Sequence, residues 1–279
     1  GSGDGSGSGT GNRMSVANFN TAGNWDTDVA NDGLIGPGDT VSLSGTLTTQ
    51  MVIQGSGTAG NQIAILFESG AKLSAAFWTS DGALKAAGKS YITVDGGNTG
   101  TVGARKTVEE STWAANIEAT DAGEGLSNVG TGYRGLYFDG SSVSCVGIIL
   151  RNLCIKNIYK KLANSTDFVD SGNNIVVEGN DILISNCYTE NGNTGIYLKS
   201  TVTNGDNLVI EDCSVLNMSN GIKYATRSSA NSISGTNNWV RRNRVDGMST
   251  WGGGIGASHH HNDGIQTITQ GSPGITGLR

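Results

Sequence analysis

A short segment recurs four times in the second half of the chain, and this internal repeat limits the possible folds more than any other feature. The copies begin at residues 150, 184, 210 and 240, so successive copies lie 34, 26 and 30 residues apart. They align without gaps as LRNLCIKN, ISNCYTEN, IEDCSVLN and VRRNRVDG. Variable spacing with a constant internal phase is typical of a solenoid, because insertions fall in loops while stacked strands keep their register.

Each copy predicts the same unit: a strand, an Asn turn, a strand, a loop and a further strand that begins Gly-Ile. The Gly-Ile pair follows the start of two copies at a constant offset of 11 residues, at Gly195-Ile196 and Gly221-Ile222. Stacking places equivalent residues in columns that step from coil to coil by about 4.8 Å. The predicted inward columns are Leu150, Ile184, Ile210 and Val240; Leu153, Cys187, Cys213 and Asn243; and Ile155, Thr189, Val215 and Val245. The predicted column of turns is Asn157, Asn191, Asn217 and Gly247.

We therefore predict an all-β chain that forms a right-handed, single-stranded parallel β-helix with loop insertions. The composition agrees, because 44 of the 279 residues are glycine and only 2 are proline. Glycine, together with Asn, Ser and Asp, provides the turns that many short strands require. Upstream of the repeats, strands are expected over residues 39–47, 50–53, 62–68, 71–74 and 91–95.

The chain is expected to form one β-helix domain over residues 16–279. Residues 1–15 begin GSGDGSGSGTGN and predict a Gly/Ser-rich linker or N-terminal extension. An insertion is expected over about 98–134, with a helix at 107–119 that begins in a capping box formed by Thr and Glu. A second inserted loop covers about 248–262. The chain does not begin with Met, so it can also be a fragment of a longer protein.

Charge and cysteine content exclude several classes of function. The formal net charge is −6 and the pI is about 5.0, so a nucleic-acid binder is not expected. No run approaches the roughly 18 apolar residues of a membrane-spanning helix. None of the four cysteines forms a C-x-x-C pair. Buried free thiols are expected, although a disulfide between Cys187 and Cys213 remains an alternative.

The repeats, together with the entry segment GPGDTVSLSGTL…VIQGSGTAGNQIAILFESGAKL, resemble the pectate-lyase-like right-handed β-helix superfamily over about residues 36–279. The entry segment is similar to the first coils of the chondroitinase B and alginate lyase group, where a P-G-D-T strand is followed by G-T-A-x-N-x-I. These motifs concern the fold and carry no catalytic information. The H-x-D-G-I segment that begins at His261 resembles a feature of β-helix proteins that process polysaccharides, which implies an extracellular or particle-surface protein that acts on polysaccharides. The Asn-Lys-Ser and Arg-x-x-x-x-Gly catalytic elements of the chondroitinase B group are absent, as are the paired Asp motifs of polygalacturonases.

The inserted loop at 248–262 is one candidate for a site, because it holds all three histidines and Trp251. Adjacent residues of a strand point to opposite faces, so only a pair such as His259 and His261 can share a metal ion. A polar surface loop, a sugar or catalytic contact and a metal site all remain open for these histidines. Calcium is also open as a cofactor, with no ligand set evident in the sequence.

A second candidate is an outward column on the Gly-Ile strands, formed by Tyr197, Lys223 and Gln266. These residues supply a ring for stacking, a cation for a carboxylate and an amide for hydroxyl groups, although an ordinary polar surface has the same composition. Another outward column is predicted on the first strand of the repeat, where Glu211 and Arg241 are expected to form a salt bridge across coils. Its members are Arg151, Ser185, Glu211 and Arg241.

Two classes of function follow. The first is a protein that binds, and as an enzyme cleaves, an acidic polysaccharide or cell-surface glycan. The residues expected in catalysis are His261, Asp263, Lys223 and Arg242, and those expected to bind substrate are Tyr197, Gln266, Trp251, His259 and Arg244. A lyase needs a base (His261, Lys223 or Tyr197) and a cation to acidify the α proton (Arg242 or Arg244).

A hydrolase needs two carboxylates about 5–10 Å apart, and the pairs considered are Asp263 with Asp246 or with Glu190. The second class is a non-catalytic structural or receptor-binding β-helix, such as a phage tailspike or tail fibre, an adhesin or a matrix fibre. A homo-oligomer or fibre is compatible with either class. Fold alone does not separate the two classes, because function is carried by sites.

Overall fold

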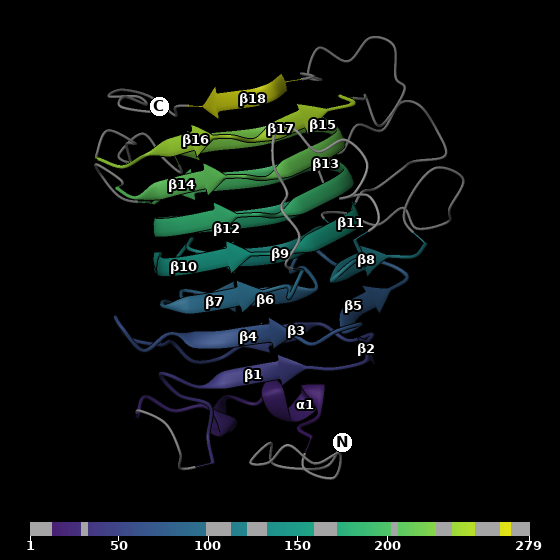
Figure 1. Ribbon diagram of the computed structural model, residues 1–279. Helices are drawn as coiled ribbons and strands as arrows, with labels where there is room; N and C mark the ends of the chain where they lie inside the picture. Colours follow the sequence, from purple (N-terminus) through teal and green to yellow (C-terminus); the bar gives the residue numbers. More distant parts are fainter. Residues whose placement is uncertain are drawn as a thin grey trace.

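The computed structural model describes residues 13–28, 33–98, 113–121, 133–158, 172–201, 206–226, 236–248 and 263–268. In these residues the chain is all β apart from two short helices near its start. The 18 strands belong to one large sheet whose strand pairs run parallel. Figure 1 shows the strands lying above one another from the N-terminal to the C-terminal end. This arrangement is compatible with the parallel β-helix that the repeat predicts.

The pairing pattern divides the strands into three stacks. At the start of the chain β1 pairs with β4, β2 with β5 and β3 with β6, so every third strand belongs to the same stack. Stack A holds β1 (Thr40–Leu43), β4 (Ile63–Phe67), β7 (Ile92–Asp95), β10 (Cys145–Arg151), the end of β12 (Asn173–Ser185), β14 (Leu208–Glu211) and β16 (Trp239–Arg241). Stack B holds β2 (Thr46–Leu47), β5 (Lys72–Ala75), β8 (Ile117–Ala119), β11 (Cys154–Ile158), the starts of β13 (Tyr188–Ser200) and β15 (Ser214–Thr226), and β17 (Arg244–Asp246). Stack C holds β3 (Met51–Ile53), β6 (Leu84–Ala87), β9 (Arg134–Asp139), the start of β12, the ends of β13 and β15, and β18 (Asp263–Ile268).

The first coil is closed by α1 (Val16–Phe19) and η2 (Ala22–Asn24). The rings of Phe19 and Trp25 meet edge to face with centroids 4.9 Å apart, and both side chains are buried. Asn20 covers the edge of β3, because its Oδ1 accepts from the amide of Val52 at 2.7 Å and its Nδ2 donates to the carbonyl of Gln50 at 2.9 Å. An exposed strand edge invites pairing with another chain, so these contacts close one end of the sheet.

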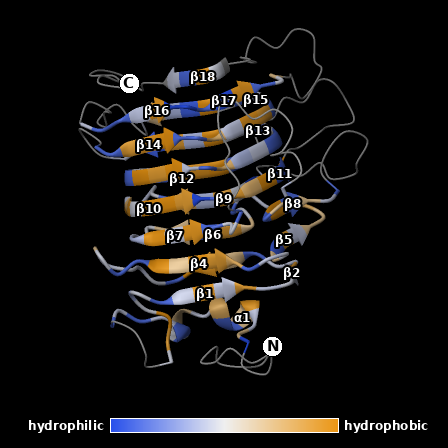
Figure 2. Ribbon diagram, in the orientation of Figure 1, coloured by the Kyte–Doolittle hydropathy of each residue, from blue (hydrophilic) through white to orange (hydrophobic). Residues whose placement is uncertain are grey.

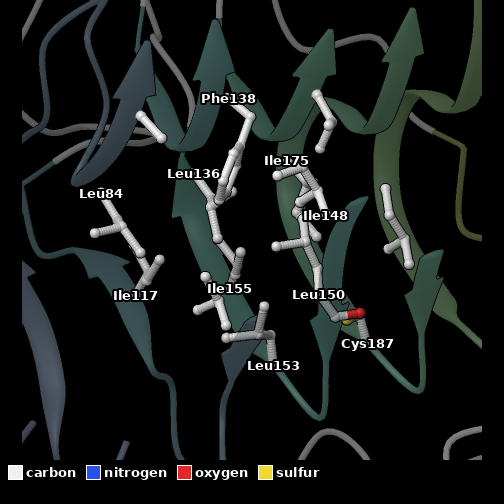
Figure 3. Close-up of a cluster of buried hydrophobic side chains, with 14 of the residues drawn as sticks. Leu84, Ile117, Leu136, Phe138, Ile148, Leu150, Leu153, Ile155, Ile175 and Cys187 are labelled. Carbon is white, nitrogen blue, oxygen red and sulfur yellow. The ribbon is translucent and has the colours of Figure 1, made fainter. Parts of the chain in front are cut away.

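The interior is a set of apolar columns, as the repeat predicts. Leu150, Ile184 and Ile210 occupy consecutive register positions and are fully buried, and Val240 follows them in the same column. The column of Ile155, Thr189, Val215 and Val245 is also confirmed. Figure 3 shows inward side chains from the three stacks meeting in one core. Burial of these side chains is the main source of stability for such a stack.

The Asn turns are confirmed and have a physical cause. Asn157, Asn191 and Asn217 have φ angles of 61°, 56° and 56°, in the left-handed region that Asn tolerates better than most residues. The side-chain amides of Asn191 and Asn217 bond to the previous coil, from Asn191 Nδ2 to Asn157 Oδ1 at 2.7 Å and from Asn217 Nδ2 to Asn191 Oδ1 at 2.6 Å. Gly247 ends the column with a φ of 64°.

The glycine of the Gly-Ile element is required by packing. A Cβ added at Gly195 would lie 2.3 Å from Cγ1 of Val215, and one added at Gly221 would lie 2.3 Å from Cγ1 of Val245. Val215 and Val245 therefore pack directly on the backbone at Gly195 and Gly221, where the stack C segments of β13 and β15 begin. A larger residue at either glycine would force the two stacks apart.

All four cysteines are free and buried, as expected. The thiol of Cys187 donates to the carbonyl of Leu150 at 3.7 Å, and that of Cys213 donates to the carbonyl of Ile184 at 3.7 Å. At the same place in the next coil, Asn243 Nδ2 donates to the carbonyl of Ile210 at 2.9 Å. The predicted column therefore exists, and its three polar members after Leu153 all reach a carbonyl of the coil before, although the closest acceptors of the two thiols are the carbonyls of Ser185 and Glu211, both at 3.2 Å.

Some sequence predictions were wrong or incomplete. The helix expected over 107–119 is wrong at its end, because residues 117–119 form β8, which pairs with β5 and β11. A strand and a helix compete for such a short segment, and neighbouring strands on both sides decide in favour of the strand. Residues 107–112 lie outside the described residues, as do residues 1–12 of the expected linker. The strand expected over 39–47 is two strands that turn at Gly45, whose φ is 69°.

Candidate functional site

The outer side of stack C brings together the residues of the predicted outward column. Tyr197, Lys223 and Gln266 occupy consecutive register positions on β13, β15 and β18. Ile196 and Ile222 are fully buried, which fixes the opposite direction for Tyr197 and Lys223. Gln266 continues the column by register, and its neighbour Ile265, on the last described strand, is 53% exposed. The prediction that these residues share one column is confirmed.

Two lysines flank the ring of Tyr197. The ammonium group of Lys199 lies 4.6 Å from the ring centroid, and that of Lys223 lies 4.8 Å from it. Both distances are within the range in which a cation is attracted to an aromatic face. Lys199 also forms an ion pair with Glu178, whose Oε1 lies 2.8 Å from Nζ and whose side chain is 2% exposed. The buried carboxylate thus fixes one cation beside the ring.

The column continues in the direction of the N-terminus with a second tyrosine. Tyr137 follows Val176 in the register, and the guanidinium carbon of Arg134 lies 3.9 Å from its ring centroid. Burial raises the pKa of Tyr137, and the charge of Glu178 raises it further, so its hydroxyl stays protonated at neutral pH. This hydroxyl donates a hydrogen bond to Asp139.

Asp139 remains a carboxylate. Burial raises its pKa, but hydrogen bonds from Ser141 and Tyr137 and the charge of Lys85 outweigh burial, so that the pKa lies below its ordinary value. Lys85 itself pairs with Asp81 at 2.7 Å. We call the outer side of stack C the stack C platform, which consists of Lys85, Tyr137, Asp139, Glu178, Tyr197, Lys199, Lys223 and Gln266.

The platform contains residues that sequence reasoning missed. Lys199 lies two residues after Tyr197 on the same strand, so strand alternation alone could have identified it. Tyr137, Asp139 and Glu178 were not identifiable in this way, because their strands fall outside the repeats and their register was unknown.

Two of the expected site residues lie elsewhere. Arg242 is at the corner between stacks A and B, where its Nη2 lies 2.6 Å from Asp212 and 2.9 Å from Glu211. Arg244 begins β17 in stack B, and its Nη2 lies 2.9 Å from Asp246. Both guanidinium groups are therefore engaged with carboxylates away from the stack C platform.

Other expected residues fall partly or wholly outside the described part of the chain. Asp263 begins β18 and stands opposite Asn220 in the register of stack C, but its side chain is not described. The predicted sites at Trp251, His259 and His261 lie outside the described residues.

The hydrolase pairs are not on one face. Glu190 and Asp246 belong to stack B, whereas Asp263 begins a strand of stack C. The structure instead places Asp139 and Glu178 at the ends of neighbouring segments of stack C, in β9 and β12. The side chain of Glu178 is 2% exposed, so this carboxylate holds Lys199 in place and does not meet a ligand directly, whereas Asp139 is half-buried.

Across the described residues, no group of three or more His, Cys, Asp or Glu side chains is arranged to hold a metal ion. The same residues include no helix that is long and apolar enough to span a membrane.

Comparisons with known proteins give no match. No family model matches the chain, and neither the curated proteins nor the solved structures contain a significant match.

Proposed function

We propose that this chain is a right-handed parallel β-helix of the pectate-lyase-like kind, and that its stack C platform binds an acidic polysaccharide outside the cell. The three stacks support the fold, since each strand returns to its own stack after one coil. Right-handedness follows from the general preference of parallel crossover connections. The resemblance of the entry segment supports the proposed superfamily.

The observation that carries the proposed function is that the ammonium groups of Lys199 and Lys223 lie 4.6 and 4.8 Å from the ring centroid of Tyr197. A tyrosine face suits the C–H face of a sugar, and a neighbouring ammonium group suits the carboxylate of a uronate. Because these side chains stand on paired strands, their spacing is set before a ligand arrives, which lowers the entropic cost of binding. Repeated coils also suit a ligand that is itself a repeating chain.

Cleavage is a further step of the same proposal. In a lyase, Lys223 would neutralise the uronate carboxylate, with Lys199, which is already paired with Glu178, beside it, and a base such as Tyr197 or His261 would take the α proton. Arg242 and Arg244 are less suited to the neutralising role, since both are paired with carboxylates away from the platform. Binding has more structural support than cleavage.

The test is a panel of acidic polysaccharides (polygalacturonate, alginate and chondroitin sulfate) with neutral dextran as the reference. Binding is measured by affinity electrophoresis, and cleavage by ultraviolet absorbance of unsaturated products together with reducing ends. Lys223→Ala and Tyr197→Ala should each weaken binding by about tenfold, because each removes a ligand contact of about 1–2 kcal/mol, namely the ammonium–carboxylate bond of Lys223 or the stacking of the Tyr197 ring on the sugar. Lys156→Ala in stack B is the matched control and should leave binding unchanged.

The inserted loop is tested with His261→Ala and Trp251→Ala. Either substitution should reduce turnover or glycan retention. The melting temperature should change little, because we propose that both residues belong to a surface loop. If no acidic polysaccharide binds, or if the Lys156 control weakens binding as much as Lys223→Ala does, the proposed function is wrong.

A further inference from the structure

The outer side of stack A has an apolar column. Its members after β7 are aliphatic or aromatic, and each is partly exposed. In register order the column is Thr93, Ile149, Leu183, Val209 and Trp239. Figure 2 shows that β4, β7, β10, β12 and β14 are largely hydrophobic. Strands that are apolar on both sides are typical of sheets that are covered on both faces. The outer side of stack A therefore has the composition of a protein–protein contact surface.

A charged column runs beside the apolar one. In register order it is Asp95, Arg151, Ser185, Glu211 and Arg241, so its signs are minus, plus, neutral, minus and plus. Neighbours pair within the chain: Arg151 Nε lies 2.7 Å from Asp95 Oδ2, and Arg241 Nε lies 2.7 Å from Glu211 Oε2. The arginine side chains are 51% and 42% exposed and the carboxylates 15% and 18%, so each pair presents mainly its arginine to a carboxylate of a second copy.

This order of charges is complementary to its own reverse. Read from the other end it is plus, minus, neutral, plus and minus, which is opposite in sign at each charged position. Consider a two-fold axis that runs parallel to the strands at the level of Ser185. Rotation about this axis places a second copy against the first with its stack reversed, so that each column faces the same column of the second copy in the opposite order. Asp95 then faces Arg241 of the second copy, and Arg151 faces its Glu211. In the apolar column, Leu183 faces its own equivalent.

We infer that the outer side of stack A is an interface for a second copy of this chain, with the two stacks antiparallel. A two-fold interface must be complementary to itself, and the charge order meets that requirement. The apolar column supplies contact area, while the charges select the register and suppress other pairings. The contact is a narrow strip, so we expect a dimer that dissociates on dilution. This inference does not depend on the stack C platform.

The experiment is sedimentation velocity of the full chain over concentrations from about 1 µM to about 1 mM, a range that detects weak association. The unaltered chain should change from monomer to dimer within this range, and added salt should shift the change to higher concentration. Leu183→Asp should remove the dimer, because it places two like charges face to face. Lys223→Ala, on stack C, is the control and should associate as the unaltered chain does.

A charge exchange separates the interface from contacts within the chain. Arg151→Glu and Glu211→Arg should each be monomeric, because like charges then face each other across the two-fold axis. An equimolar mixture should recover the dimer, since the introduced acid of one chain meets the introduced arginine of the other. Mixing changes no contact within a chain, and circular dichroism checks that each variant is folded.

Three results would overturn the inference. The first is an unaltered chain that stays monomeric over the whole range. The second is a single variant that still dimerises normally. The third is a mixture of two folded variants that fails to recover the dimer.

Discussion

The Asn turns predict an unusual order of stability, in which replacing a turn asparagine by glycine destabilises the protein less than replacing it by alanine. Asn191 has a φ of 56°, donates to Asn157 at 2.7 Å and accepts from Asn217 at 2.6 Å. Asn191→Gly removes both hydrogen bonds but keeps a backbone conformation that glycine adopts freely. Asn191→Ala removes the same bonds and adds the strain of a left-handed conformation.

The magnitudes follow from these contacts. Two neutral hydrogen bonds at partly exposed positions contribute about 1–2 kcal/mol in total, because the partners left behind can bond to water. The left-handed conformation costs alanine about 1 kcal/mol more. Asn191→Gly should therefore lower the free energy of unfolding by about 1–2 kcal/mol, and Asn191→Ala by about 2–3 kcal/mol.

Urea denaturation followed by circular dichroism measures both values, with equal slopes required of the variants being compared. Thr46, an exposed strand residue outside the positive-φ set, provides the matched control. There the order should reverse, with Thr46→Gly less stable than Thr46→Ala, because glycine loses more entropy in a strand. If the free energy of unfolding of Asn191→Ala equals or exceeds that of Asn191→Gly, the left-handed turn at Asn191 is refuted.

Three further predictions concern the core, the thiols and the response to acid. Ile210→Asp should cost several kcal/mol in unfolding free energy, against about 1 kcal/mol for Ile210→Val, since the buried carboxylate lacks a partner; near-equal values would contradict the inward column. Thiol titration of the denatured, unreduced chain should find four free thiols, and finding two would reveal a disulfide. For Asp95, burial raises the pKa, but hydrogen bonds from Asn152, the Gly97 amide and Arg151 outweigh it, so the pKa lies below 3.8. The stability that this carboxylate contributes is present above pH 3.8 and lost as the pH falls through its lowered pKa, so Asp95→Asn should flatten the acid end of the stability curve; an unchanged curve would argue against this pairing.

The repeat predicted the second half of the fold in detail because its residues are read directly as register. Ile184, Ile210 and Val240 share one column because aliphatic residues recur at the same phase of each copy. The first half was harder, since β6 has the sequence LKAA and lacks the β-branched residues that indicate a strand. Its place in the sheet comes from β3 and β9 on either side, which local sequence does not reveal.

The candidate site was predictable only in part, for a related reason. Tyr197 and Lys223 were found because they follow the Gly-Ile element in two aligned copies. Asp139 and Glu178 were missed, because their proximity depends on the register between β9 and β12. The inserted loop was favoured for its histidines, and that preference remains a prediction.

The most direct test of the proposed function is isothermal titration calorimetry with polygalacturonate and with the same polymer after methyl esterification. Esterification removes the carboxylate charge and keeps the sugar ring, so it separates attraction to the lysines from stacking on tyrosine. We predict that the unaltered chain binds the acidic polymer at least tenfold more tightly than the ester, and that Lys223→Ala removes most of this preference while Lys156→Ala does not. Equal affinity for the two polymers, or a preference that survives Lys223→Ala, would contradict the account.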